Sequence, residues 1–156
     1  MPYHIHWFKK NLRFQDNEIL LKTYNSSPIL LYIIEPELWL QKDMSQRQWE
    51  FIWESLKSLK IDLAENNLHL NILFGDTSEI FKKLYQKYSF TKVISEQETG
   101  IHWTFERDKK LKSLFKELNV HWIEYPYFGV KRGIHNRDYW AGSIQQILKK
   151  PLINKE

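Results

Sequence analysis

The chain has 156 residues, a length that suits one domain with one core, and its 42% hydrophobic and 15% aromatic content excludes a disordered segment. Cysteine is absent, which excludes both a disulfide framework and a thiolate metal site. The net charge of +4, from 23 basic and 19 acidic residues, permits an anionic ligand or nucleic acid, although a solvated, lysine-rich surface is the simpler interpretation.

Membrane and export signals are missing from the sequence. The longest apolar run, 29–34, has the length of a strand and is far too short to cross a bilayer. The N-terminus does not place a basic stretch before an apolar one, as a signal peptide would. We therefore expect a soluble cytoplasmic protein that has no membrane partner.

Strands and helices alternate along the first half of the chain. Residues 3–8 are aromatic and β-branched and predict a strand, after which Asp16 is predicted to cap a helix. Residues 28–34 are almost continuously apolar, as in a parallel strand that is buried on both faces. Ser45 and Gln48 then form a capping box that predicts the start of a long helix.

The same alternation continues to the end of the chain. The remaining predicted elements are a strand over 68–74, a helix from Asp76, a strand over 91–95, a helix capped by Thr104, a strand over 120–125, and an amphipathic helix from Trp140 that ends at Pro151. This order predicts an α/β fold, a three-layer α/β/α, Rossmann-like (flavodoxin-like) domain with a five-stranded parallel sheet. A ligand is then expected outside the carboxyl ends of the strands, where the strand order reverses.

The loops at the strand exits carry the candidate site. They combine basic groups, carboxylates and amides with aromatic side chains, which suits a flat heterocycle held by stacking and by hydrogen bonds along its edge. Glu98 is the strongest candidate for such an edge hydrogen bond, followed by Glu35 and Lys10. The full set of predicted binding residues is Lys10, Asn11, Tyr32, Glu35, Glu96, Gln97 and Glu98.

Other kinds of site have weak support. The sequence contains neither of the glycine-rich motifs that cradle phosphates, and no serine sits in a nucleophile elbow, so no catalytic residue is predicted. His4 and His6 share one face of a strand but have no third metal ligand nearby, so they are interpreted as ordinary strand residues. Trp49 and Trp53 are interpreted as core residues of a helix. The carboxylates of 95–100 could equally form a solvated loop.

Five collinear segments resemble the DNA photolyase/cryptochrome family. "WFKKNLRFQDN" (7–17) is similar to the family's N-terminal signature, and "LYIIEPELW" and "DMSQRQWEFIWESLKSLKIDLAENNLHLNILFGD" are similar to its second strand, second helix and third strand. "SEQETGIHWTFERDKKL" resembles the loop after the fourth strand, which leads to an Arg-Asp pair on the next helix. "YFGVKRGIHNRDYW" resembles the segment that leads toward the interdomain linker.

The resemblance implies a divided protein. Residues 1–130 correspond to the α/β domain, which in this family binds a light-harvesting antenna (a reduced folate, a deazaflavin or FMN), and 131–156 to a C-terminal helix and the start of the linker. The helical domain that carries FAD, the electron-transfer tryptophans and most of the DNA-binding surface is not in this chain. We therefore expect an inactive, monomeric antenna domain that presents Tyr127, Phe128 and Trp140 to that helical domain, supplied in cis or in trans, and that meets DNA only through the full-length protein.

Two points stay open at this stage. The family's Arg-Arg-Asp is replaced by Lys9, Lys10 and Asn11, which removes the planar bidentate group and one charge and puts charge pairing by this loop in doubt. The alternative to the antenna domain is a free-standing flavodoxin-like module that binds a nucleotide or a partner protein. A bound chromophore in the purified protein would distinguish the two.

Overall fold

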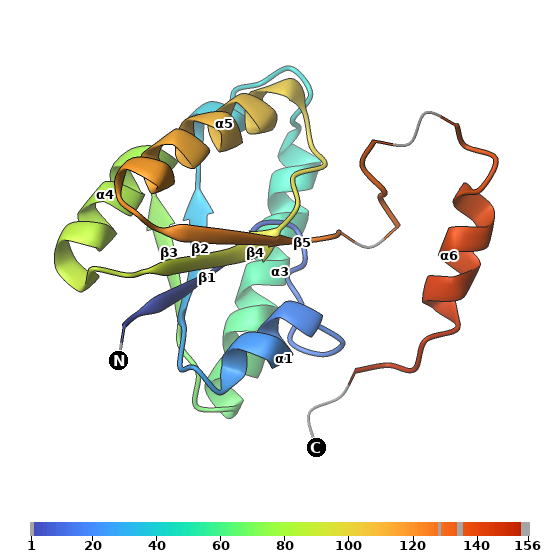
Figure 1. The fold of residues 1–156 in the computed structure, drawn as a ribbon, viewed down its shortest axis with the longest axis horizontal. Coiled ribbons are helices and arrows are strands. Elements are labelled where there is room, and N and C mark those ends of the chain that lie inside the picture. Colours follow the sequence, from blue (N-terminus) through green and yellow to red (C-terminus); the bar gives the residue numbers. More distant parts are fainter. Residues whose placement is uncertain (1, 128, 134–135, 154–156) are drawn as a thin grey trace.

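The computed structural model describes residues 2–127, 129–133 and 136–153, and its centre is a five-stranded parallel sheet (Figure 1). The strands are β1 (His4–Phe8), β2 (Ile29–Ile34), β3 (Leu70–Phe74), β4 (Lys92–Glu96) and β5 (His121–Tyr125), in the spatial order β3-β2-β1-β4-β5. Every neighbouring pair is parallel, which confirms the predicted fold class. The order is that of the Rossmann class, whereas flavodoxins order their strands 2-1-3-4-5. The chain reverses direction across the sheet at β1, so the predicted crevice lies between the ends of β1 and β4.

Helices cover both faces of this sheet, as predicted (Figure 1). The helices α4 (Thr77–Tyr88) and α5 (His102–Glu117) pack on one face, and α1 (Glu18–Tyr24) and α3 (Gln46–Glu65) pack on the other. The two remaining helices are the single turn α2 (Pro36–Trp39) and the C-terminal α6 (Trp140–Leu148).

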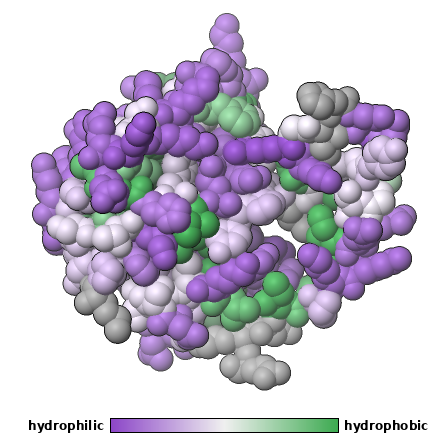
Figure 2. All heavy atoms as spheres, viewed as in Figure 1, coloured by the Kyte–Doolittle hydropathy of each residue, from purple (hydrophilic) through white to green (hydrophobic). Residues whose placement is uncertain are grey.

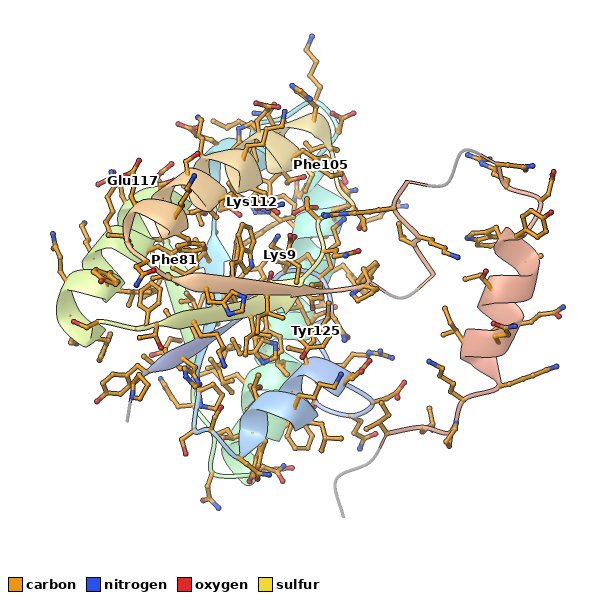
Figure 3. The ribbon with its side chains drawn as sticks, viewed as in Figure 1. Lys9, Phe81, Phe105, Lys112, Glu117 and Tyr125 are labelled. Atoms are coloured by element: carbon orange, nitrogen blue, oxygen red, sulfur yellow. The ribbon has the colours of Figure 1, made fainter. Side chains whose placement is uncertain are left out.

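The alternation of side chains along β1 divides the core into two halves. Ile5 and Trp7 join the cluster under α4 and α5, where Phe81 also packs, while Phe8 joins the cluster under α1 and α3 (Figure 3). His6 is fully buried on the second face and stacks on the ring of Phe8. Burial lowers the pKa of His6 to about 3, so its ring is neutral and packs as part of the core.

Helix starts follow the predicted caps at two of four places. The capping box of Ser45 and Gln48 is confirmed, and the Asp76 side chain accepts from the backbone N–H of Glu79. The cap predicted at Asp16 is wrong, because the neighbouring Asn17 accepts from Leu20 N while Asp16 has a positive φ of 49°.

The start predicted at Thr104 is also wrong. Helix α5 begins at His102, and the Thr104 hydroxyl lies inside its first turn, where it donates to the carbonyl of Ile101 at 2.7 Å. The helix therefore starts three residues earlier than a cap at Thr104 would give. The loop before it is held by side-chain hydrogen bonds to its backbone.

The interpretation of Trp49 and Trp53 as core residues is wrong for Trp53, which is 41% exposed, while Trp49 is half-buried. The core stripe of α3 consists of Leu56, Leu59 and Leu63. The two tryptophans lie at its edge and stack on each other with 5.9 Å between ring centroids. They form a surface row with Trp39 of α2, whose ring lies 5.1 Å from that of Trp49.

The C-terminal helix α6 stands apart from the sheet and its covering helices (Figure 1), and no α6 residue is buried. Its anchors are few: the Trp140 indole donates to the carbonyl of Gly129, and the N–H of Ile153 donates to Asp16. Trp140 is 48% exposed and Tyr127 is half-buried, while Phe128 lies outside the described residues. Most of the surface on this face is hydrophilic (Figure 2). Among the residues described, no helix is both long and apolar enough to cross a membrane.

The two faces of α3 give a direct test of this packing. Leu63→Ala removes a side chain that is 0% exposed, and it should lower the free energy of unfolding by about 2–5 kcal/mol because a cavity replaces its contacts. Ile61→Ala, on the same helix but at 60% exposure, should change it by less than about 0.5 kcal/mol. Denaturant unfolding of both variants measures this, and equal losses would contradict the assigned face.

Candidate functional site

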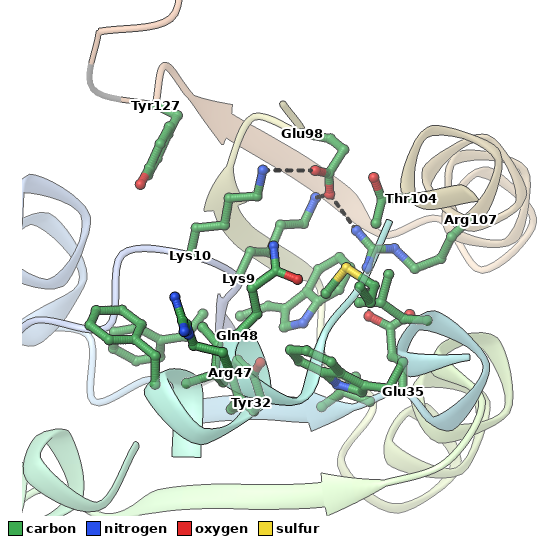
Figure 4. Close-up of a pocket in the computed structure, with 18 residues that line it drawn as sticks. Lys9, Lys10, Tyr32, Glu35, Arg47, Gln48, Glu98, Thr104, Arg107 and Tyr127 are labelled. Atoms are coloured by element: carbon green, nitrogen blue, oxygen red, sulfur yellow. Dashed lines mark hydrogen bonds and ion pairs between the residues drawn. The ribbon is translucent and has the colours of Figure 1, made fainter. Parts of the chain in front are cut away.

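A pocket of about 550 Å³ opens at the carboxyl ends of the strands, next to the point where the strand order reverses (Figure 4). Its walls are mainly aromatic and aliphatic. Trp7 comes from β1, Trp39 from α2 and Tyr127 from the segment after β5, and the first turns of α3 close another side. The polar lining residues include Lys9, Lys10, Tyr32, Glu35, Arg47, Gln48, Glu98, Thr104 and Arg107.

A buried network of charges lies along one wall of this pocket. Arg107 of α5 binds Glu35 at 2.5 Å, Glu98 at 2.6 Å and Asp108 at 3.0 Å. Lys9 binds Asp108 at 2.7 Å and lies 3.6 Å from Glu98. The side chains of all five residues are at most 8% exposed. Buried charges at this depth persist because each one has an opposite partner.

The network ties together segments that are distant in sequence. Lys9 follows β1, Glu35 follows β2 and Glu98 follows β4, while Arg107 and Asp108 lie in the second turn of α5. Parallel strands bring their carboxyl ends to one edge, and the α5 side chains cross above that edge to meet them. The network therefore holds the exit loops of β1, β2 and β4 in position against α5.

The turn after β4 is shaped around the Glu98 carboxylate. Its Oε1 accepts the backbone N–H groups of Thr99 at 3.0 Å and Gly100 at 2.7 Å. A Cβ at position 100 would come within 2.7 Å of Thr104 Oγ1 and 2.8 Å of Glu98 Oε1, so a larger residue there would displace these two side chains. Lys10 adds a third cation, 3.7 Å from the same carboxylate.

The environment shifts the pKa values of these groups in opposite directions. Burial by itself would raise the pKa of Glu98, but Lys9, Arg107 and the Gly100 N–H lower it to about 2. Burial raises the pKa of Glu35 despite its contact with Arg107. Burial also lowers the pKa of Lys9, and its carboxylate partners oppose that effect. At neutral pH Glu98 is a fixed anion that holds the cations in place.

Cations also lie against the aromatic wall. The Lys9 ammonium is 4.6 Å from the centroid of the Trp7 ring, and the Arg107 guanidinium is 5.0 Å from it. Lys10 lies 5.9 Å from the ring of Tyr127. The site therefore places an aromatic-lined cavity beside paired charges, an arrangement suited to a flat ligand. The five charges of the buried network are paired with one another, which suits a role in positioning.

Four of the seven predicted binding residues line this pocket, namely Lys10, Tyr32, Glu35 and Glu98. Glu98 has both oxygens engaged by protein groups, so a ligand would have to share them. Whether these residues bind a ligand stays a prediction.

The other three predicted residues, Asn11, Glu96 and Gln97, are not among those that line the pocket. The Glu96 carboxylate accepts the backbone N–H groups of Lys9 and Asn11, both at 3.1 Å, and so holds the β1 exit loop against β4. The Asn11 side chain accepts from Arg13, and the Gln97 N–H donates to the carbonyl of Tyr125. All three thus shape the loops around the pocket.

The doubt about charge pairing in the β1 exit loop is resolved by Lys9. Its ammonium divides its contacts between Asp108 and Glu98, which a point charge does without the planar fork of arginine. The replacement of the family's second arginine by Lys10 likewise keeps a cation beside Glu98.

Sequence reasoning missed the α5 pair Arg107 and Asp108 as site residues, although a signal was present. Arg107 stands four residues before Leu111 and eight before Phe115, which places a charge on the buried stripe of the helix. Such a charge needs a partner inside the fold. It also missed Arg47 and Phe51 of α3, which line the pocket. Both positions are exposed, so neither residue appears as a charge on a buried stripe of the helix.

Comparison with known proteins places this fold and site in a family. The family model described as DNA photolyase matches residues 4–126. The chain belongs to the DNA photolyase/cryptochrome family. Cryptochrome-1 of Macaca fascicularis is 27% identical over 118 residues, and Cryptochrome-2 of Gallus gallus is also 27% identical over 118 residues. Each match covers 74% of this chain and 20% of the relative, so the chain spans about a fifth of the length of these family members.

Solved structures of photolyases and cryptochromes share the fold. The archaeal photolyase of Sulfolobus tokodaii superimposes with a TM-score of 0.78 at 19% identity, over 98% of this chain and 37% of that one. The class III photolyase of Agrobacterium tumefaciens gives a TM-score of 0.74 at 20% identity, over 88% of this chain and 28% of that one. The Synechocystis cryptochrome gives 0.70 at 17% identity, over 80% and 27%.

The buried network makes a prediction about acid stability. Glu98→Gln should lower the free energy of unfolding at pH 7 by about 3 kcal/mol, because it removes a counter-charge from Lys9 and Arg107. A carboxyl whose folded pKa is depressed stabilises above its unfolded pKa and loses that effect as pH falls through its folded pKa. The difference from wild type should therefore shrink between about pH 4.5 and pH 2.

Denaturant unfolding at several pH values measures this difference. The control is Glu106→Gln, on the neighbouring helix α5, whose exposed pair with Lys109 should contribute nothing measurable. A Glu98→Gln penalty that stays constant down to pH 2 would show that the carboxylate charge is not what stabilises the fold.

Proposed function

We propose that this chain is the antenna-binding domain of a photolyase- or cryptochrome-type flavoprotein, and that its main pocket holds a light-harvesting chromophore. The observation that carries the proposal is the 550 Å³ pocket at the reversal of strand order, with aromatic walls and a buried, self-paired charge network. An antenna must be held at a fixed distance and angle from an acceptor. That task needs a rigid, water-poor cavity and no nucleophile or general base.

The pocket supports a flat, mainly apolar heterocycle. Trp39 provides a ring surface, and Leu38 and Met44 add apolar side chains to the lining. A volume of about 550 Å³ lies within the range of small-molecule sites. A reduced folate, a deazaflavin and FMN all have such a ring system. The S. tokodaii photolyase structure, reported with two FAD molecules and the implication of a novel light-harvesting cofactor, supports a flavin-sized ligand in this fold.

The remaining parts of the proposal concern the complete protein. Residues 1–130 form the antenna domain, and 131–156, with the exposed helix α6, begin the connection to a helical FAD-binding domain supplied in cis or in trans. The aromatic residues Tyr127 and Trp140 are available for that contact. DNA repair or blue-light signalling is then the activity of the complete cytoplasmic protein. This domain absorbs light for that activity.

Chromophore binding can be tested at the aromatic wall. Titration with FMN, a deazaflavin and a reduced folate, followed by fluorescence, should identify a ligand that binds the wild-type chain. Trp39→Ala should weaken that ligand by about 1–3 kcal/mol, the usual contribution of a stacked ring. Trp53→Ala, in the same aromatic row but outside the pocket lining, should leave the affinity unchanged. No binding of any of the three would contradict the proposal.

Light-driven repair gives a second test of the domain's role. The isolated chain should not repair ultraviolet-damaged DNA under illumination, because electron donation to a flipped-out lesion requires the reduced flavin of the helical domain. Addition of the helical domain of a photolyase relative in trans should restore measurable repair. Repair by the 156-residue chain alone would overturn the assignment of this domain to light harvesting.

A further inference from the structure

A second, smaller pocket of about 170 Å³ lies beside the ends of β2 and β3. It is lined by the start of α2, by the loop that leads from β3 into α4, and by Trp103 of α5. Glu35 lines both this small pocket and the main pocket. The volume is several times the roughly 30 Å³ that one water molecule occupies, so the space can admit a single six-membered ring.

Two buried polar atoms in the lining of the small pocket have no hydrogen-bond partner. They are Glu35 Oε2 and Thr77 Oγ1, on residues that are 6% and 2% exposed. The Thr77 hydroxyl is near enough to the carboxylate to lower the pKa of Glu35, but the geometry forms no hydrogen bond between them. Two other buried atoms without a hydrogen-bond partner occur in the described part of the chain, on His6 and Glu124, and neither residue lines either of these two pockets. An unpaired buried group is unfavourable, and a bound partner would remove that penalty.

The charges around the small pocket disfavour an anionic ligand. The charge of Glu35 is already balanced by Arg107 through its other oxygen. The carboxylates of Glu37 and Asp76 disfavour an anion at the same place. No group of three or more His, Asp or Glu side chains among the described residues could hold a metal ion.

The acceptor and donor atoms in the lining further limit which ligands would fit. Glu35 Oε2 accepts a hydrogen bond, whereas the Thr77 hydroxyl can donate one. Thr77 is the first residue of α4, whose N-terminal end favours a carbonyl oxygen. A ring that carries an N–H next to a C=O satisfies both atoms at once, and the Trp103 side chain supplies a flat surface for it.

We propose that the small pocket is a separate binding site for a neutral, flat lactam ring, with the ring N–H donating to Glu35 Oε2 and the adjacent C=O accepting from Thr77 Oγ1. This site is distinct from the main pocket that holds the antenna in the proposed function. It does not depend on which chromophore binds there, or on whether one binds.

Uracil is the probe that tests this site, and 1,3-dimethyluracil is its control because methyl groups replace both N–H donors. Two-dimensional NMR of ¹⁵N-labelled chain should show uracil shifting the backbone amide of Thr77 and the indole of Trp103. The dimethyl compound should bind at least about tenfold more weakly. Thr77→Val keeps the shape of the side chain and should weaken uracil by about five- to tenfold, the effect of one hydrogen bond.

Two control variants show whether a loss of uracil binding arises in the small pocket itself. Thr91→Val makes the same change before β4, at the opposite end of the sheet, and should leave uracil affinity unchanged. Trp39→Ala alters the main pocket and should also leave uracil affinity unchanged. Loss of chromophore binding and loss of uracil binding are therefore independent results. Absence of uracil binding, equal binding of 1,3-dimethyluracil, or binding that is insensitive to Thr77→Val would each overturn the proposal.

Discussion

The contact of Arg107 with Glu98 and Glu35, completed by Lys9 and Asp108, is the interaction on which the rest of the site depends. Five charged side chains are buried at the edge of the sheet, where each one would be strongly unfavourable alone. Because their partners lie on different segments, the charges can be satisfied only when the exits of β1, β2 and β4 and the second turn of α5 are all in place. The network therefore specifies the positions of the loops, even where its net contribution to stability is modest.

This arrangement also explains the character of the main pocket. The wall beside Trp7 carries several charges, yet these charges are directed at one another. A ligand consequently meets an aromatic surface with a fixed electrostatic field and few free hydrogen-bonding groups. Under the proposed function, this cavity would hold the chromophore in a fixed orientation, as energy transfer to a second domain requires.

Glu35 connects the two pockets, because it lines both of them. One of its oxygens is used by Arg107, and the other has no hydrogen-bond partner. The fold thus leaves two buried polar atoms without hydrogen-bond partners at the ends of β2 and β3, away from the point where the strand order reverses. The loop from β3 to α4 is short, and its helix begins directly at the Asp76 cap. It approaches Glu35 closely enough to enclose a small cavity but not to complete its hydrogen bonds.

The sequence by itself determined the fold class, because a continuously apolar second strand and alternating strand and helix patterns leave a parallel sheet between two helix layers as the way to bury the core. It also identified the strand-exit loops, since parallel strands bring their carboxyl ends together, and Lys10, Tyr32, Glu35 and Glu98 do line one pocket. Only the tertiary structure decided which charges pair. Arg107 meets Glu35 across 72 positions in the chain, and no local pattern encodes a contact of that range. The different roles of Glu96 and Glu98 also depend on distant contacts. The Glu96 carboxylate accepts the backbone N–H groups of the β1 exit loop, whereas Glu98 lines the pocket.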